Sequence, residues 1–452
     1  MKRNLVLVLF TVFFSSQLVA QENKNIQQII SNIDANRIEK DIRTLANFGT
    51  RNTFSDTVSS TRGIGAARRW IKNEFEQIAS KSESKFEVFY QKDYVTTNAG
   101  ERVLKDTWVV NVVAIQKSKK PSNSYVIMSG DIDSRNSDTM DFTSDAPGAN
   151  DNASGMAGVI EAARVLSQFN FEHNIIYLGL SGEEQGLFGG KGFAAFVKEK
   201  NWNIIGVLNN DMIGNIEGVD GIIDNRTFRI FSEPTNPTAS ENEIKMQRYY
   251  GGEVDGNSRQ LARYIYTTTK KHMPEMNPMM IFRLDRFGRG GHHKPFSDLG
   301  LPAVRIMETH ENYNRQHQNI RTENGIKYGD VLEGVDFEYT KKLTTVNAIN
   351  LASLANAPLA PINVKIGGAV SANTTLEWQK NNDPNIIGYK IYWRETTSPT
   401  WDNSIFTTNP SSYTLNNLVI DNYYFGVAAV GKNGSESLVV FPNSIIRKPF
   451  RR

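Results

Sequence analysis

The chain has 452 residues, more than one hydrophobic core usually supports, so its length predicts two domains. The formal net charge is +3, but Lys2 and Arg3 lie in a predicted leader and four more basic residues stand in the last six positions. The rest of the chain is therefore close to neutral or mildly acidic, which gives no support to nucleic-acid binding. The sequence contains no cysteine, so disulfides are excluded and stability must come from the core and from any bound metal.

Residues 1–20 have the order of a secretory signal peptide: a basic start, an apolar run and a small residue, Ala20, before Gln21. The apolar run is short for a membrane span, and no later stretch of the sequence approaches membrane length. We therefore expect a secreted or periplasmic protein with no membrane span after removal of the signal. Export without any cysteine suits a bacterial protein better than a secreted eukaryotic one.

Hydrophobic periodicity predicts two helical regions ahead of a sheet, over residues 26–48 and 64–78. Strands and helices then alternate along the chain. The expected strands cover residues 85–90, 108–116, 125–128, 174–180, 204–209 and 302–306, and the expected helices cover residues 155–169, 189–198, 256–271 and 337–356. This alternation predicts an α/β domain over residues 21–356, with a mixed, mostly parallel sheet and helices on both faces.

The composition changes at APLAP, residues 357–361, which we interpret as a short stiff linker. Beyond it, residues 362–447 show two-residue alternation in TTLEW, GYKIYW, SSYTL and YYFGVAAV, with Gly, Pro and Asn between these segments. The pattern predicts a small all-β sandwich. It resembles a fibronectin type III module, in which Trp378 is expected to be the core tryptophan and whose simplest role is that of a stabilising spacer.

Acidic residues and a histidine gather in the loops of the predicted α/β domain. They are Asp131 and Asp133 in SGDIDSR, Asp151 in PGANDNASG, Glu183 and Glu184 in LSGEEQG, Asp211 in NNDMIG, and His293 in GGHHKPF. A lone aspartate after a strand is most often a turn or a helix cap, so the inference depends on the joint arrangement. Most of these residues follow an expected strand, where the strands of an α/β sheet end in loops. The arrangement predicts a zinc or two-metal site with one carboxylate left to move protons.

The order of these motifs resembles the secreted zinc aminopeptidase family of bacteria, whose relatives include the glutaminyl cyclases, over roughly residues 35–350. The segments FGTR and GIGAARRWI also look like this family. The resemblance implies that Asp151 bridges two metals, that Glu184 and His293 complete one metal site, and that Asp211 belongs to the other. It also implies that Glu183 is the general base and that Asp133 supports the site without binding metal.

Two positions depart from the family pattern. Asp131 stands where the family has its first histidine ligand, and His292 stands where an aspartate usually precedes the last histidine. By resemblance, one metal would then be held by Asp131, Asp151 and Asp211, an all-oxygen set that should favour Mn²⁺, Mg²⁺ or Ca²⁺ over zinc or hold zinc more loosely. The expected cofactor is one or two Zn²⁺ ions, with the Asp131 site open to another divalent cation. We interpret His292 as a solvated neighbour, a substrate-polarising group or an alternative ligand.

These features predict an exported metallopeptidase, by resemblance an aminopeptidase, that acts on a peptide or protein substrate. Glu183 would accept the proton of a water molecule that the metal activates, and would then protonate the leaving amine. Neighbouring side chains point apart, which allows Glu184 to reach the metal while Glu183 faces the water.

Two alternatives stay open. One is an aminoacyl transferase of the glutaminyl cyclase kind, which by resemblance uses a single zinc at the positions of Asp151, Glu184 and His293. The other is a non-catalytic metal-binding protein in which the sandwich carries the function. His310 and His317 in ETHENYNRQHQ we interpret as local structure or as support for the site.

Overall fold

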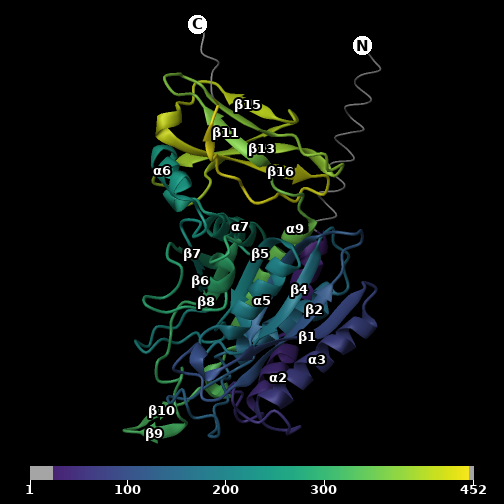
Figure 1. Cartoon of the computed structure of the whole chain (residues 1–452), viewed down its shortest axis with the longest axis vertical. Helices are drawn as coiled ribbons and strands as arrows, with labels where there is room; N and C mark the ends of the chain where they lie inside the picture. The colour runs from purple at the N-terminus through teal and green to yellow at the C-terminus, as the bar shows by residue number, and fades with distance from the viewer. Residues whose placement is uncertain (1–23, 447–452) are drawn as a thin grey trace.

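The structure is a computed structural model that describes residues 24–446. The predicted signal peptide, residues 1–20, lies outside this range, as do residues 447–452 at the other end. An α/β domain and a smaller β-sandwich are joined end to end (Figure 1). Within the described residues, no helix combines the length and the apolar character needed to cross a membrane.

An eight-stranded mixed sheet forms the centre of the larger domain. In spatial order its strands are β1 (Phe86–Val95), β2 (Thr107–Gln116), β4 (Asn174–Leu180), β3 (Ser124–Asp131), β5 (Asn203–Asn210), β8 (Ala303–Glu308), β6 (Thr227–Ser232) and β7 (Asn277–Ile281). The central strands β4, β3, β5 and β8 run parallel to one another, so their carboxyl ends share one edge of the sheet. The predicted α/β class is confirmed.

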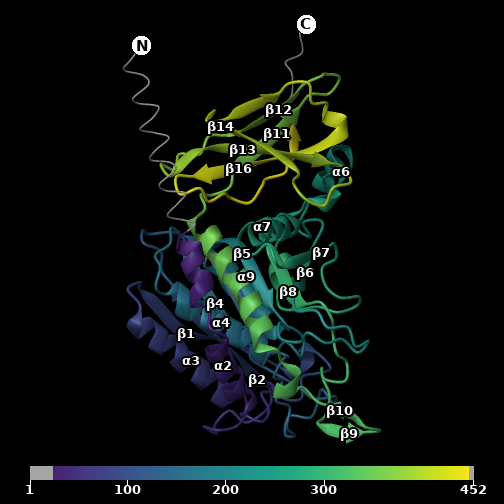
Figure 2. The same ribbon diagram turned by 180° about the vertical axis from the view of Figure 1, so that it is seen from behind.

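Helices cover both faces of the sheet because its strands bury side chains on both sides. In β2, Val112 and Ala114 join one hydrophobic core, while Val113 and Ile115 join the other. The first core packs against a group of helices that Figure 2 shows on one side of the sheet: α2 (Ala35–Ala46), α3 (Gly63–Lys81), α4 (Ala153–Leu166), α7 (Asn257–His272) and α9 (Phe337–Asn356). The second core packs against α5 (Phe188–Glu199) and α8 (Lys294–Ser297).

Several short elements of this domain were not predicted. β6 and β7 extend the sheet beyond β8, and α6 (Glu241–Tyr250) and the hairpin β9 (Arg321–Glu323) and β10 (Ile326–Tyr328) lie outside the cores. Every residue of α6 is at least partly exposed, so hydrophobic periodicity does not predict a helix there. Its start is instead defined by a capping box, in which Ser240 and Glu243 exchange hydrogen bonds.

The sandwich consists of two sheets with a core between them. One sheet contains β15 (Ser412–Leu415), β12 (Thr374–Gln379), β11 (Ile362–Gly367) and β17 (Ser444–Ile445), and the other contains β14 (Asn403–Thr407), β13 (Ile386–Glu395) and β16 (Tyr423–Gly431). Trp378 and Tyr389 are both buried, and their ring centres lie 4.9 Å apart. The predicted core position of Trp378 is confirmed, while the likeness to a fibronectin type III module stays a prediction.

A buried ion-pair network fastens the sandwich to the α/β domain. Asp255, just before α7, binds Arg263 of α7 (Oδ1–Nη1 2.6 Å) and Arg394 of β13 (Oδ2–Nη2 2.7 Å). All three side chains are at most 2% exposed. The Trp401 indole of the sandwich donates a hydrogen bond of 3.1 Å to Gln260 of α7. The sandwich is therefore docked on α7 and is not held by its linker alone.

Replacing Asp255 with alanine leaves two buried guanidinium groups without their shared counter-charge. We expect this change to lower the free energy of unfolding by about 3–5 kcal/mol. Scanning calorimetry of the variant should show the sandwich melting ahead of the α/β domain.

The matched control is Asp298→Ala, which removes the partner of Lys294 in an ion pair whose aspartate is 50% exposed. This change should alter the free energy of unfolding by less than about 1 kcal/mol. Identical melting curves for the two variants would contradict the role of Asp255 in docking.

Candidate metal centre

Most of the predicted site residues lie in the loops that follow the central strands. Asp131 ends β3 and Asp133 comes two residues later, Glu183 and Glu184 lie between β4 and α5, and Asp211 follows β5 directly. Parallel strands place such loops side by side at one edge of the sheet. The expectation that these carboxylates share one edge is confirmed.

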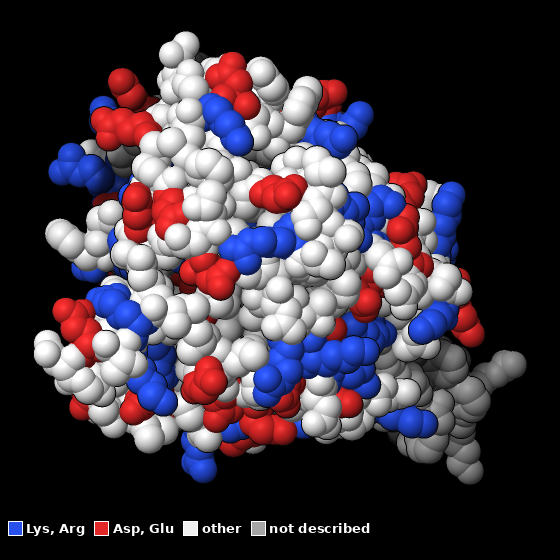
Figure 3. Space-filling view, turned by 90° about the horizontal axis from the view of Figure 1, so that it is seen from below, with Lys and Arg blue, Asp and Glu red and all other residues white. Residues whose placement is uncertain are grey.

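This edge lies at the end of the molecule remote from the sandwich. α9 begins beside it, where the amide of Asp336 donates a hydrogen bond to the carbonyl of Gly214, and ends at the linker. The 20 residues of α9 correspond to a length of about 30 Å. Figure 3 views this end of the molecule, where acidic and basic side chains are interspersed and neither sign covers the surface. The described residues of the sandwich therefore contribute nothing to the site.

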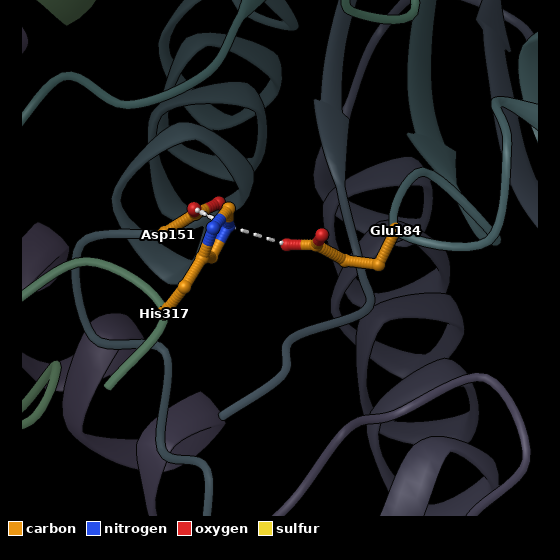
Figure 4. A group of neighbouring side chains, drawn as sticks. All are labelled: Asp151, Glu184 and His317. Atoms are coloured by element: carbon orange, nitrogen blue, oxygen red, sulfur yellow. Dashed lines mark ion pairs between the residues drawn. The ribbon is translucent and has the colours of Figure 1, made fainter. Parts of the chain in front are cut away.

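Three potential ligand atoms converge at this edge. They belong to the carboxylates of Asp151 and Glu184 and to the imidazole of His317, and all lie within 4.8 Å of one another. His317 Nε2 lies 2.8 Å from Asp151 Oδ2 and 2.9 Å from Glu184 Oε1, as Figure 4 shows. Across residues 24–446 this is the one group of three His, Asp or Glu side chains that meets this distance.

The loop of Asp151 is fixed from two sides. The amides of Asn150 and Asp151 donate hydrogen bonds of 2.8 and 2.7 Å to the carboxylate of Asp330. Gly148 adopts a φ of +51°, and a Cβ at this position would stand 2.3 Å from the carbonyl oxygen of Asp151. Only glycine fits this close turn, which aims Asp151 at the centre of the site.

Glu184 is held by its neighbours in a similar way. Its amide donates a hydrogen bond of 3.1 Å to Asp133, and its side chain accepts one of 2.6 Å from Arg135 Nε. Asp133 therefore contacts the backbone of a donor residue without joining the donor group.

His317 has an unusual backbone for its residue type. Its φ of +54° lies in the left-handed region, which costs a non-glycine residue on the order of 1–2 kcal/mol. Arg135 Nη2 lies 2.7 Å from Nδ1 of the ring, while Nε2 faces the carboxylates of Asp151 and Glu184. These contacts maintain the strained conformation, and strain of this kind is concentrated at functional sites.

The space between the two carboxylates stabilises positive charge. Burial works to lower the pKa of His317, but Glu184 and Asp151 raise it to about 9. Burial also works to raise the pKa of both carboxyl groups, yet His317 lowers the pKa of each below its ordinary value. A cation is thus favoured where the three donors meet, which is the electrostatic requirement for a metal site.

His293, the predicted ligand, lies outside this group. Its Nε2 donates a hydrogen bond of 2.7 Å to the carbonyl of Leu284 and lies 3.7 Å from Asp285. The histidine that joins the donor group is His317, from the loop after β8. The structure thus corrects the expected set of Asp151, Glu184 and His293.

Asp131 and Asp211, the other two predicted ligands, are bound by protein groups. His292 Nδ1 lies 2.5 Å from Asp131, and Arg305 Nη2 lies 2.9 Å from Asp211. Burial raises the pKa of Asp131 to about 8 and that of Asp211 to about 7. His292 is fully buried, so its interpretation as a solvated neighbour is wrong.

Glu183 is a spare carboxylate beside the donor group. Its residue is partly exposed, and within residues 24–446 its side chain makes no hydrogen bond or ion pair. Burial raises its pKa well above the ordinary value, and the nearby charges of Glu184, Asp211, Asp131 and Asp151 add to this effect. A free carboxylate with raised proton affinity suits the predicted role of general base.

Comparisons with known proteins agree with this chemistry. Residues 111–332 match the model of "Peptidase family M28". A protein of Pyrenophora tritici-repentis described as "Probable zinc metalloprotease" is 37% identical over 423 residues, which cover 93% of this chain and 98% of the relative. The chain belongs to peptidase family M28. The part matched by the M28 model contains all the predicted site residues as well as His317.

Other relatives extend this result. A probable zinc metalloprotease of Leptosphaeria maculans is 42% identical over 421 residues, covering 93% of this M28 peptidase and 97% of the relative. Both of these relatives come from fungi, whereas the sequence had suggested a bacterial protein. The crystal structure of the Legionella pneumophila aminopeptidase LapA superposes with a TM-score of 0.52 at 17% identity, covering 74% of this chain and 75% of that one. This likeness shows a shared fold.

Exchange of His317 for alanine removes one of the three converging donors. We expect Zn²⁺ binding, measured by competition with a chromogenic chelator, to weaken by more than about 100-fold, because loss of a direct donor exceeds the loss of a supporting contact. His293→Ala is the matched control, and its affinity should stay within about threefold of the original chain. The opposite order of affinities would restore His293 to the ligand set.

Proposed function

We propose that the protein is a zinc-dependent aminopeptidase in which Asp151, Glu184 and His317 hold the metal. The observation that carries this proposal is the convergence of two carboxylates and one imidazole beside the unpaired carboxylate of Glu183. Zinc accepts nitrogen and oxygen ligands, and its catalytic sites use three protein ligands and leave a position for water or substrate. The zinc metalloproteases among the relatives and the aminopeptidase fold of LapA support the same function.

Each residue around the donor group has a part in the proposed reaction. Zinc at this position would supply the Lewis acidity that activates water near neutral pH. Glu183 takes the proton from the attacking water at its carboxylate and returns it to the leaving amine. Asp330 holds the Asp151 loop, and Arg135 positions the side chain of Glu184.

A substrate panel tests the aminopeptidase assignment. Aminoacyl reporter amides should be cleaved by the zinc-loaded protein, and the same amides with an acetylated amino group should not, because an aminopeptidase requires the free amino group. Cleavage of blocked internal peptide bonds at a comparable rate would point to an endopeptidase instead. A glutaminyl peptide that releases ammonia without hydrolysis would favour the cyclase alternative.

Glu183→Gln keeps the shape of the side chain but removes its ability to accept a proton. We expect kcat to fall by about 10²–10⁴-fold while the Zn²⁺ affinity stays within about threefold. Glu101→Gln, at an exposed position, is the matched control and should leave both quantities unchanged. An unchanged kcat in the Glu183 variant would refute its role as the base.

We further propose that the protein is exported, because residues 1–20 have the pattern of a signal peptide. Amino-terminal sequencing of the protein recovered from medium or periplasm should begin at Gln21. A chain that keeps Met1 inside the cell would contradict export.

We also propose that the sandwich acts as a stabilising fibronectin-like spacer. Its buried contacts with α7 support that role.

A further inference from the structure

The position predicted for a second metal contains a protein cation. Arg305 comes from β8, where it is paired in register with Asn209 of the neighbouring β5. Its Nη2 lies 2.9 Å from Asp211 Oδ2, and its Nε donates a hydrogen bond of 2.7 Å to the carbonyl of the same residue. Nη1 lies 3.0 Å from Asp285 Oδ2. The guanidinium group is fully buried and is fixed on both sides by carboxylates.

Asp131, the second carboxylate of that predicted site, is also fully engaged. His292 Nδ1 lies 2.5 Å from Asp131 Oδ1, and Asn152 donates a hydrogen bond of 2.8 Å to Asp131 Oδ2. Each oxygen of this carboxylate therefore has a protein partner. Of the three oxygen ligands expected for the second metal, only Asp151 belongs to the converging donor group.

The residues present do not fit a second metal ion. The guanidinium of an arginine stays charged at every physiological pH. A divalent cation among Asp131, Asp151 and Asp211 would therefore share a buried space with a permanent positive charge, and their repulsion is strong where water is excluded. Asp211 would also have to exchange its contacts with Arg305 for the metal, which would leave the buried arginine with Asp285 alone as its carboxylate partner.

We propose that this peptidase holds a single metal ion, at Asp151, Glu184 and His317, and that Arg305 takes the place of a second one. The fixed charge of Arg305 neutralises Asp211 and lies close enough to interact with Glu183. Arg305 is thus a positioning residue that supplies part of the charge that a second metal would bring. The inference rests on the proposed function for the first site but concerns the number of ions.

Metal stoichiometry tests the proposal directly on the mature chain. The protein is stripped with a chelator and titrated with Co²⁺ and, separately, with Zn²⁺, and bound metal is measured by elemental analysis after gel filtration. We expect an endpoint at one ion per chain, with full recovery of hydrolysis at that point. Two tightly bound ions would overturn the proposal and leave the zinc peptidase function standing. A protein that binds no ion and hydrolyses nothing would overturn both.

Two isosteric variants identify which carboxylates bind metal. Asp211→Asn should keep one ion per chain, with a Zn²⁺ affinity within about threefold of the original, because Asp211 is a partner of Arg305. Glu184→Gln, the matched change within the donor group, should weaken Zn²⁺ binding by more than about 100-fold. Loss of an ion from the Asp211 variant would overturn the proposal.

The exclusion of a second ion by Arg305 has its own test. The double variant Arg305→Met with Asp285→Asn removes the guanidinium and one of its two carboxylate partners, so that no unpaired charge is left beside Asp211. We expect this chain to bind a second Co²⁺ ion, visible as a second step in the absorbance titration. A folded double variant that still stops at one ion would overturn the role given to Arg305. If the double variant does not fold, the Asp211→Asn variant still decides whether Asp211 binds an ion, and with it whether the chain holds one ion or two.

Discussion

Burial of several carboxylates at one sheet edge is the constraint on which the rest of this structure depends. A buried charge is costly unless a partner of opposite sign lies close by. Parallel strands bring acidic loops together at their carboxyl ends, and the protein supplies basic side chains at fixed places among them. The partners are Arg305 for Asp211, His292 for Asp131, and Arg135 and His317 for Glu184. What is left is one position, between Asp151 and Glu184, that is suited to a metal ion.

Two separate ion-pair systems therefore perform different tasks in one chain. The group around Asp151 prepares a site for chemistry, while the group around Asp255 joins two domains at the far end of α9. In the first, His317 lies between the carboxylates of Asp151 and Glu184, and in the second, Asp255 lies between the guanidinium groups of Arg263 and Arg394. The length of α9 separates the sandwich from the site.

The sequence was most informative where local pattern decides the structure. The parallel strands were predicted because their apolar runs are bounded by turns, and the acidic residues were found because most of them follow those strands. His317 was missed because it stands nine residues beyond the end of β8, in a loop with no periodic signal. GGHHKPF offered a stronger motif, and the choice of His293 followed from it. Arg305 meets Asp211 because β5 and β8 are neighbours in the sheet. Strand order is a tertiary property that hydrophobic periodicity does not encode.

The order of charges along the chain has a consequence for how this domain can be assembled. The six carboxylates of the site all lie between residues 131 and 211, whereas three of the basic side chains that face them, His292, Arg305 and His317, lie near the end of the domain. During synthesis, the acidic loops therefore emerge well before most of their basic partners. The first half of the domain lacks these partners, so the sheet edge is complete only when β8 and the loop after it are in place.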